Sequence, residues 1–169
     1  MTEERWQQLR DKILLLGDPR LNEVSAPVKR EELPQMREVV GELHEILTAY
    51  KVRYGKFRAI AAPQIGVMKR LIYMCIDEPV VILNPVMTEQ SEEMMELWDD
   101  CLCFPDLLVR VRRHASLRLT FRDLDWQEHA VVFEGDLAEL LQHEYDHLDG
   151  ILATQRAIDG TSFCWRRGR

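Results

Sequence analysis

The spacing of apolar residues in the first third of the chain predicts one long amphipathic helix. Residues 13–28 contain prolines at positions 19 and 27 and are typical of extended chain and turns. From Pro34 onward, where proline is well accommodated in a first turn, apolar side chains recur at steps of three and four residues: Met36, Val39, Val40, Leu43, Ile46, Leu47 and Tyr50. We therefore predict a helix that starts near Pro34 and buries this face.

Beyond residue 70 the pattern changes to short runs that are typical of β-strands. Five such runs are separated by Asp, Pro and Asn, at residues 71–76, 79–83, 107–111, 116–121 and 129–133. Apolar and polar residues alternate strictly in 109–112 and in 116–121, which is the pattern of half-buried antiparallel strands.

A second helix is predicted after the strands, over residues 136–148. Asp136 is a suitable N-cap and Gly150 is a natural stop. The order helix, strands, helix predicts an α+β fold. A length of 169 residues is enough for one domain with its own core, so we expect a single domain over residues 1–169. The sequence does not determine the oligomeric state, and we favour a monomer. In it, antiparallel strands pack around this central helix, preceded by an N-terminal helix.

The charge balance narrows the range of partners. The chain has 22 Lys and Arg residues against 29 Asp and Glu, a formal net charge of −7, which argues against a nucleic-acid or membrane-surface binder. The basic tail, Arg166, Arg167 and Arg169, is expected to be a frayed, solvated terminus. The early apolar run of residues 13–16 is too short for a signal sequence or a membrane span. We therefore expect a cytoplasmic protein with reduced cysteines, at positions 75, 101, 103 and 164.

The second predicted helix contains a motif that indicates metal binding. Residues 143–147, His-Glu-Tyr-Asp-His, have the form HExxH. Each helical residue advances by about 100°, so His143 and His147 lie one turn apart on one face and can bind a single metal ion. Glu144 lies between this face and the core face, where its carboxylate can reach a metal-bound water.

A catalytic site of the zinc type uses three protein ligands, so a third ligand must come from elsewhere. His114 and His129 lie in charged, strand-rich stretches, and nothing marks either of them as a ligand. Cys101 lies in the acidic, turn-prone segment 98–105, and spacing alone does not separate it from Cys103. At this point the third ligand remains open among these residues.

The segment 60–66, Ile-Ala-Ala-Pro-Gln-Ile-Gly, is a weaker signal. Small side chains let a backbone approach a ligand closely, and the Gln64 amide can donate a hydrogen bond to a developing oxyanion. The same residues are also compatible with an ordinary turn that contains a polar loop residue. This segment alone therefore does not predict a catalytic site.

Taken together, these segments resemble the peptide deformylase family in their order and spacing. Residues 59–66 (AIAAPQIG) resemble its first motif, residues 99–103 (DDCLC) its second and residues 142–150 (QHEYDHLDG) its third. The third motif is fully kept, while the first two are altered. The resemblance covers about residues 13 to 155 and marks the chain as a divergent member.

The resemblance implies a metal-dependent hydrolase that removes the formyl group from N-formylmethionyl peptides. Its partner would be a formylated peptide or nascent-chain N-terminus, in the N-terminal methionine processing step of protein biosynthesis, with no direct role for nucleic acid or membrane. Cys101 would become the third ligand, beside His143 and His147. The family's usual metal is Fe2+, with Zn2+, Ni2+ or Co2+ as substitutes.

The same resemblance implies the catalytic roles. Glu144 would act as general acid/base while metal-bound water attacks the formyl carbon. The Gln64 amide and the backbone N–H of Leu102 would donate hydrogen bonds to the oxyanion.

The departures from the family pattern fall in the first two motifs. Phe57 and Ala59 stand in place of two glycines, with Arg58 between them, and Asp99–Asp100 stands in place of Glu-Gly. A side chain at such a position opposes close backbone approach, so Arg58, Ala59 and Asp100 are candidate substrate-binding residues. Two alternatives stay open: an amidase of the same fold that acts on a non-methionyl or small-molecule formamide, and a metal-binding homologue with weak turnover.

Overall fold

The structure is a computed structural model that describes residues 1–166. Its α-helices are α1 (Glu3–Arg10), α2 (Leu33–Tyr54) and α3 (Gly135–Leu148). Its strands are β1 (Ala59–Ala61), β2 (Leu71–Cys75), β3 (Pro79–Thr88), β4 (Met94–Asp100), β5 (Leu107–His114), β6 (Ser116–Arg122), β7 (Glu128–Glu134) and β8 (Phe163–Trp165). Short 3-10 turns lie at Pro19–Asn22, Arg30–Glu32, Ala62–Ile65 and Ala153–Arg156.

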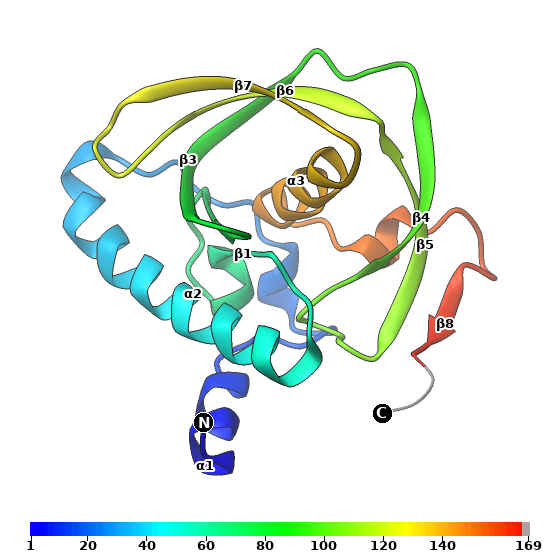
Figure 1. Ribbon diagram of the computed structural model, residues 1–169, viewed down its shortest axis with the longest axis horizontal. Coiled ribbons are helices and arrows are strands. Elements are labelled where there is room, and N and C mark those ends of the chain that lie inside the picture. Colours follow the sequence, from blue (N-terminus) through cyan, green and yellow to red (C-terminus); the bar gives the residue numbers. More distant parts are fainter. Residues whose placement is uncertain (167–169) are drawn as a thin grey trace.

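The strands form two antiparallel sheets on either side of α3 (Figure 1). The larger sheet has the order β1-β2-β3-β6-β7, and the smaller one has the order β4-β5-β8. Helix α2 runs from the left of the view to its lower centre, and α1 lies below α2 at the bottom of the view. This arrangement confirms the α+β class, with antiparallel strands around the helix that carries the HExxH motif.

Helix α3 is held in place by an apolar face. Ala138, Leu141 and Leu148 are all 0 % exposed. They pack against apolar side chains of the larger sheet, Ile72, Ile82, Leu117, Leu119 and Phe121. Full burial of a leucine stabilises a fold by about 1.5–3 kcal/mol, so this contact fixes α3 firmly against the sheet.

The predicted first helix is confirmed, and it extends about one turn beyond its apolar stripe at each end. It includes Pro34 in its first turn and ends at Tyr54. Gly55 follows in the left-handed conformation, with φ of 68°, and its N–H donates to the carbonyl of Lys51 at 2.8 Å. This is a common way to end a helix, because glycine adopts that conformation without a Cβ penalty.

All five predicted strand runs are strands in the structure, namely β2, β3, β5, β6 and β7. The apolar pattern did not predict α1, β1, β4 or β8. Strands β1 and β8 have only three residues each, so neither offers a periodicity to detect.

The predicted N-cap of the second helix is wrong. Helix α3 begins at Gly135, and its N-cap is Glu134 in an extended conformation. Strand β7 runs directly into the helix, so Asp136 lies inside the first turn. There its negative charge still interacts favourably with the positive end of the helix dipole.

The expectation of a frayed basic tail is wrong for Arg166. Strand β8 pairs with β5, and the backbone N–H of Arg166 donates to the carbonyl of Asp106 at 2.8 Å. The Arg166 guanidinium pairs with the Asp100 carboxylate at 2.5 Å. Arg167 and Arg169 lie outside the described residues.

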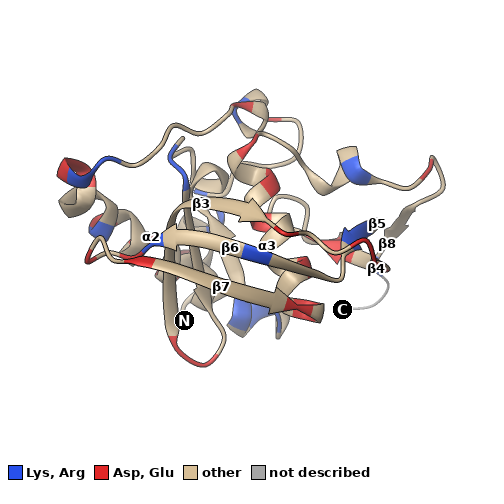
Figure 2. Cartoon of the chain, turned by 90° about the horizontal axis from the view of Figure 1, so that it is seen from above, with Lys and Arg blue, Asp and Glu red and all other residues tan. Residues whose placement is uncertain are grey.

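Charged residues are interspersed along the elements instead of collecting on one of them (Figure 2). In the described part of the chain, no helix combines the length and the apolar character needed to span a bilayer.

Candidate metal centre

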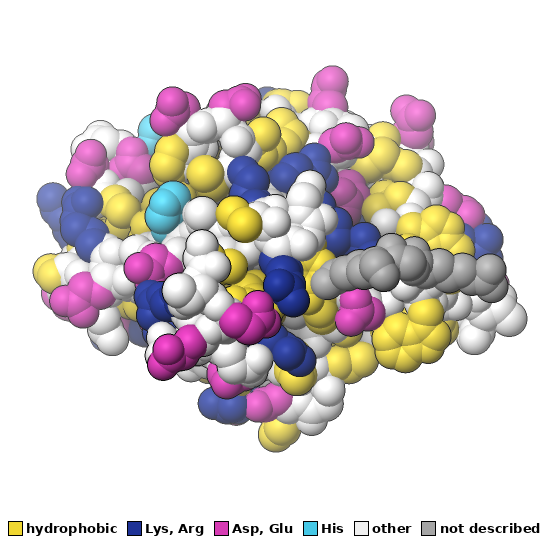
Figure 3. All heavy atoms as spheres, turned by 60° about the horizontal axis from the view of Figure 1, so that its bottom comes forward, with side chains coloured by type: hydrophobic (Ala, Val, Ile, Leu, Met, Phe, Trp, Pro, Cys, Tyr) yellow, Lys and Arg dark blue, Asp and Glu magenta, His cyan; other side chains and the backbone are white. Residues whose placement is uncertain are grey.

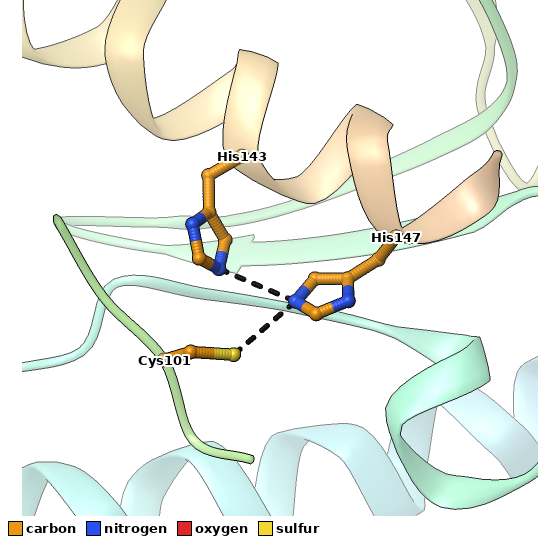
Figure 4. Close-up of side chains that lie close together, drawn as sticks. All are labelled: Cys101, His143 and His147. Atoms are coloured by element: carbon orange, nitrogen blue, oxygen red, sulfur yellow. Dashed lines mark hydrogen bonds between the residues drawn. The ribbon is translucent and has the colours of Figure 1, made fainter. Parts of the chain in front are cut away.

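The two histidines of the HExxH motif face each other from successive turns of α3 (Figure 4). The Nε2 atoms of His143 and His147 lie 3.2 Å apart. Both residues are buried, with 5 % and 1 % of their surfaces exposed. The four-residue step therefore places both imidazoles on one face of the helix, as the spacing predicts.

Cys101 brings a thiol to the same point from another element. It directly follows β4, and its Sγ lies 3.3 Å from Nε2 of His147 (Figure 4). Cys101, His143 and His147 are all buried, and their potential ligand atoms lie within 4.8 Å of one another.

The other candidates for third ligand lie elsewhere. His114 Nδ1 is 2.7 Å from a backbone carbonyl, and His129 Nε2 is 2.7 Å from the Asp123 carboxylate. Cys103 is buried close to Cys101, and its backbone N–H donates to the Cys101 sulfur at 3.4 Å. Its own thiol does not belong to the cluster that the described residues form.

The donor set fits a divalent metal ion. Nitrogen and sulfur atoms bound tetrahedrally to one zinc-like ion at about 2.0–2.3 Å lie roughly 3.3–3.6 Å apart. The separations of 3.2 Å and 3.3 Å in this cluster are close to that range. Burial raises the pKa of the Cys101 thiol above its ordinary value. Since a metal ligand is a thiolate, metal binding here would release a proton.

A buried carboxylate orients His143. Asp99 accepts a hydrogen bond from His143 Nδ1 at 2.9 Å, which leaves Nε2 turned to the cluster. Arg113 NH2 donates to Asp99 at 3.0 Å, and Arg113 NH1 donates to Asp146 at 2.5 Å. Burial favours neutral groups here, but the ion pairing outweighs it: the pKa of His143 is raised to about 10, and the pKa of Asp99 is lowered to about 2.

Sequence reasoning missed this network, although β5 carries a signal for it. Val109 and Val111 are buried on one face of the strand, and Arg113 lies in phase with them at 3 % exposure. A guanidinium at a core-facing strand position requires carboxylate partners. Asp99 had no role of its own in the sequence-based prediction, whereas in the structure its carboxylate contacts His143 and Arg113.

Glu144 lies beside the ligands with a carboxylate oxygen that nothing engages. The residue is 2 % exposed, and its Oε2 has no hydrogen-bond partner among the described residues. Burial raises the pKa of Glu144 to about 7. A carboxylate that is not held in an ion pair and titrates near neutrality is suited to proton transfer.

Gln64 is fully buried, and its amide is oriented by the backbone. Its Oε1 accepts the N–H of Ala61 at 2.8 Å, which turns Nε2 toward the thiols of Cys101 at 3.5 Å and Cys103 at 3.6 Å. Leu102, which follows Cys101 directly, is buried as well. Both predicted oxyanion donors thus lie next to the metal cluster.

A cavity of about 530 Å³ opens next to these groups. Its lining includes His143, Glu144 and Leu102 together with the three candidate substrate residues, Arg58, Ala59 and Asp100. The lining therefore includes predicted residues from each of the three motifs, whereas Gln64, Cys101 and His147 are not part of it.

Phe57 occupies a backbone conformation that favours glycine. Its φ is 73°, which costs a residue with a Cβ roughly 1–2 kcal/mol. Its ring packs against Tyr50 and Tyr54, with centroid distances of 5.7 Å and 5.6 Å. Each such aromatic pair contributes about 0.5–1.5 kcal/mol, so packing on α2 offsets the backbone strain.

Comparison with known proteins points to one family. The family profile described as "Polypeptide deformylase" matches residues 10–162. A relative from Bordetella pertussis, "Peptide deformylase 1", is 35% identical over 162 residues, which cover 89% of each chain.

Solved structures of similar fold are also named as peptide deformylases. The fold is similar to that of a peptide deformylase from Synechococcus elongatus in complex with actinonin, with a TM-score of 0.81 and 25% identity over 89% of this chain and 80% of that one. It is also similar to a Met-Ala-Ser-bound peptide deformylase from Acinetobacter baumannii, with a TM-score of 0.76 and 28% identity over 85% of this chain and 96% of that one.

Proposed function

The chain belongs to the polypeptide deformylase family, and from this membership we propose that Cys101, His143 and His147 hold the metal at which it hydrolyses N-formylmethionyl peptides. Family and fold make it a metal-dependent hydrolase of N-formyl groups. One observation carries the assignment of the site: three ligand atoms converge within 4.8 Å, beside a buried Glu144 oxygen with no partner in the described chain.

The family and the Cys-His-His cluster support a single metal ion, and ferrous iron is our assignment. One thiolate and two imidazoles suit Fe2+ as well as Zn2+, and Ni2+ or Co2+ would substitute. When bound, such an ion lowers the pKa of a water ligand to about 7 and so supplies a nucleophile at neutral pH.

Glu144 moves the proton in this proposal. It accepts a proton from the attacking water and returns it to the leaving amine, so formate and a free N-terminus are produced. The support is structural: among residues 1–166, Oε2 has no hydrogen-bond partner from which it would first have to separate.

Gln64 and Leu102 stabilise the oxyanion that develops on the formyl group. The Gln64 amide is preorganised by the Ala61 N–H, so its NH2 group faces the metal cluster before substrate arrives. Preorganised donors of this kind require no reorientation during the reaction. The backbone N–H of Leu102 is the second donor.

We assign the peptide to the 530 Å³ cavity, where Arg58, Ala59 and Asp100 would contact it. The Met-Ala-Ser-bound relative supports a peptide as ligand. We further assign the protein to the cytoplasm, where nascent chains emerge, as a monomeric single domain over residues 1–169. All the proposed ligands and catalytic groups come from one chain.

The test is formate release from formyl-Met-Ala-Ser by protein purified anaerobically with Fe2+. Glu144→Gln is the matched variant: it should retain the metal and the fold while losing nearly all turnover, because the amide cannot accept a proton from water. Absence of formate release by the metal-loaded protein would refute the proposed function. Loss of metal from Glu144→Gln would show that the carboxylate is a ligand or a structural support instead of the proton carrier.

A further inference from the structure

One wall of the cavity carries an ion pair that includes Glu139, a residue that the motifs did not mark. Glu139 lies on α3 one turn before His143, so both side chains lie on the same face of the helix. Arg58 directly precedes β1, and its NH2 is 3.5 Å from the Glu139 carboxylate. Both residues line the cavity together with His143 and Glu144. The pair therefore lies next to the proposed reaction centre.

The two charges are partly withdrawn from solvent and only loosely joined. The Glu139 side chain is 14 % exposed and the Arg58 side chain is 37 % exposed. Burial raises the pKa of Glu139 to about 7, so its carboxylate form predominates above that pH. Their separation of 3.5 Å is longer than the roughly 2.7–2.9 Å of a charge-assisted hydrogen bond. Arg58 also lies 4.0 Å from the exposed Asp136, a contact that stabilises little. Both head groups therefore retain the capacity to bind a polar ligand.

Positive and negative side chains are balanced in the rest of the lining. The cavity as a whole has four Lys and Arg side chains and four Asp and Glu side chains. Lys51 Nζ donates to the Cys75 carbonyl at 2.9 Å, while Lys56 and Arg166 both pair with Asp100. On the face shown in Figure 3, acidic and basic side chains likewise lie next to one another around apolar atoms. The lining therefore offers paired charges, which do not favour a substrate of either sign.

The distance from the metal cluster indicates which part of a substrate meets this pair. In the proposed function the formyl carbon lies at the metal, and the first side chain of the peptide branches from the backbone close to that carbon. A long side chain such as that of Met or Gln then reaches about one helical turn, roughly 5.4 Å, which is the step from His143 back to Glu139.

We propose that Glu139 and Arg58 determine the substrate specificity, so that the chain prefers formyl peptides whose first side chain carries a carboxamide, as in Gln, over those with Met. A carboxamide has a carbonyl acceptor and an NH2 donor, so it can bind Arg58 and Glu139 at the same time. An apolar side chain removes water from both charges without replacing the lost hydrogen bonds. A charged side chain meets one like charge. The inference rests on the proposed function and specifies its substrate class.

The test compares formyl peptides that differ only in the first residue, on the metal-loaded protein above pH 7. The substrates are formyl-Gln-Ala-Ser, formyl-Met-Ala-Ser, formyl-Glu-Ala-Ser and formyl-Lys-Ala-Ser. Gln and Met have unbranched side chains of similar length, so their comparison isolates polarity. We expect kcat/KM for the Gln peptide to exceed that for the Met peptide by about tenfold, the effect of one hydrogen bond to a charged group. The Glu and Lys peptides should both be poorer substrates than the Gln peptide.

Variants of the pair should redirect this preference. Arg58→Met together with Glu139→Leu removes both charges and should reverse the order of the Gln and Met peptides. Glu139→Gln leaves Arg58 without this counter-charge and should raise kcat/KM for the Glu peptide several-fold relative to the Gln peptide. Arg118→Gln, which removes an arginine paired with the exposed Glu89 at 2.9 Å, should leave every ratio unchanged. Calorimetric binding of the same peptides to metal-loaded Glu144→Gln measures the preference without turnover, and it should show the same order.

The outcomes separate the inference from the proposed function. A kcat/KM for formyl-Met-Ala-Ser that equals or exceeds that for formyl-Gln-Ala-Ser would overturn the inference and leave the proposed function standing. A Gln preference that persists after both charges are removed would overturn the role of Glu139 and Arg58. If no formyl peptide releases formate, the proposed function fails and the inference fails with it.

Discussion

At the scale of single residues, two neighbouring thiols compete for the role of metal ligand. We expect Cys101→Ala to lower metal content from about one ion per chain to near zero, since a site with two imidazoles alone is incomplete. Cys103→Ala and Cys75→Ala should keep the metal. Metal analysis after anaerobic purification measures all three. If Cys103→Ala empties the site, the sulfur that lies outside the cluster in the structure is the true ligand.

Replacing Asp99 should test whether its carboxylate orients His143 for metal binding. Asp99→Asn keeps the size of the side chain but removes the charge between His143 and Arg113. We expect metal affinity to fall by about 10–100-fold, as for other groups that orient a metal ligand. Breaking one side of a buried ion pair should also cost about 3–5 kcal/mol of unfolding free energy.

Metal titration and urea unfolding with a chelator measure these two effects separately. Asp125→Asn is the control, because its ion pair with Arg37 is exposed and should contribute less than about 1 kcal/mol. A stability loss in Asp99→Asn with unchanged metal affinity would mean that Asp99 supports the fold and does not orient His143.

Individual residues also show how far the sequence could predict the site. The helical step of four residues was sufficient to place His143 and His147 on one face. Nothing in the spacing could choose Cys101 over Cys103 or over the strand histidines, because that choice depends on where β4 ends relative to α3. The resemblance made that choice, and Cys101 is the cysteine that lies near both histidines in the described residues. The partners of Arg113 were equally hidden, since they come from β4 and α3.

At the scale of elements, β4 explains why the strand pattern was incomplete. Its residues include Glu96 and two exposed apolar side chains, Met94 and Trp98. Pairing with β5 determines its conformation: Glu96 lies opposite Arg112 in the register and forms an ion pair with it. Tertiary pairing of this kind overrides local propensity.

The end of α3 gives a prediction at this scale. Gly150 has a φ of 70°, and a Cβ there would lie 2.6 Å from the backbone of Asn22. Gly150→Ala should therefore cost about 2–4 kcal/mol of unfolding free energy, from backbone strain and from forced separation of the two segments. Urea unfolding measures this cost. Gly160→Ala is the control, because a Cβ there meets nothing within 4 Å. Equal stability of the two variants would show that the 19–22 turn moves aside easily.

At the scale of the whole molecule, the metal cluster joins parts of the fold that have separate cores. Cys101 belongs to the core cluster that includes α2, whereas Leu141 and Leu148 of α3 belong to the cluster under the larger sheet. An ion held by Cys101, His143 and His147 would link these two clusters. Since the three ligands are brought together only in the folded chain, metal binding should stabilise the folded state.

Metal removal should therefore lower thermal stability. Free metal at 100 times its Kd adds about 2.7 kcal/mol to a protein with one site. For a chain of this length, each kcal/mol shifts Tm by about 2–4 °C, so a chelator should lower Tm by roughly 5–10 °C. Calorimetry with Ni2+ and with excess chelator measures this shift. Glu144→Gln should keep the metal-dependent shift, because Glu144 is not a ligand, whereas Cys101→Ala should lose it. A full shift in Cys101→Ala would place the stabilising ion somewhere other than this cluster.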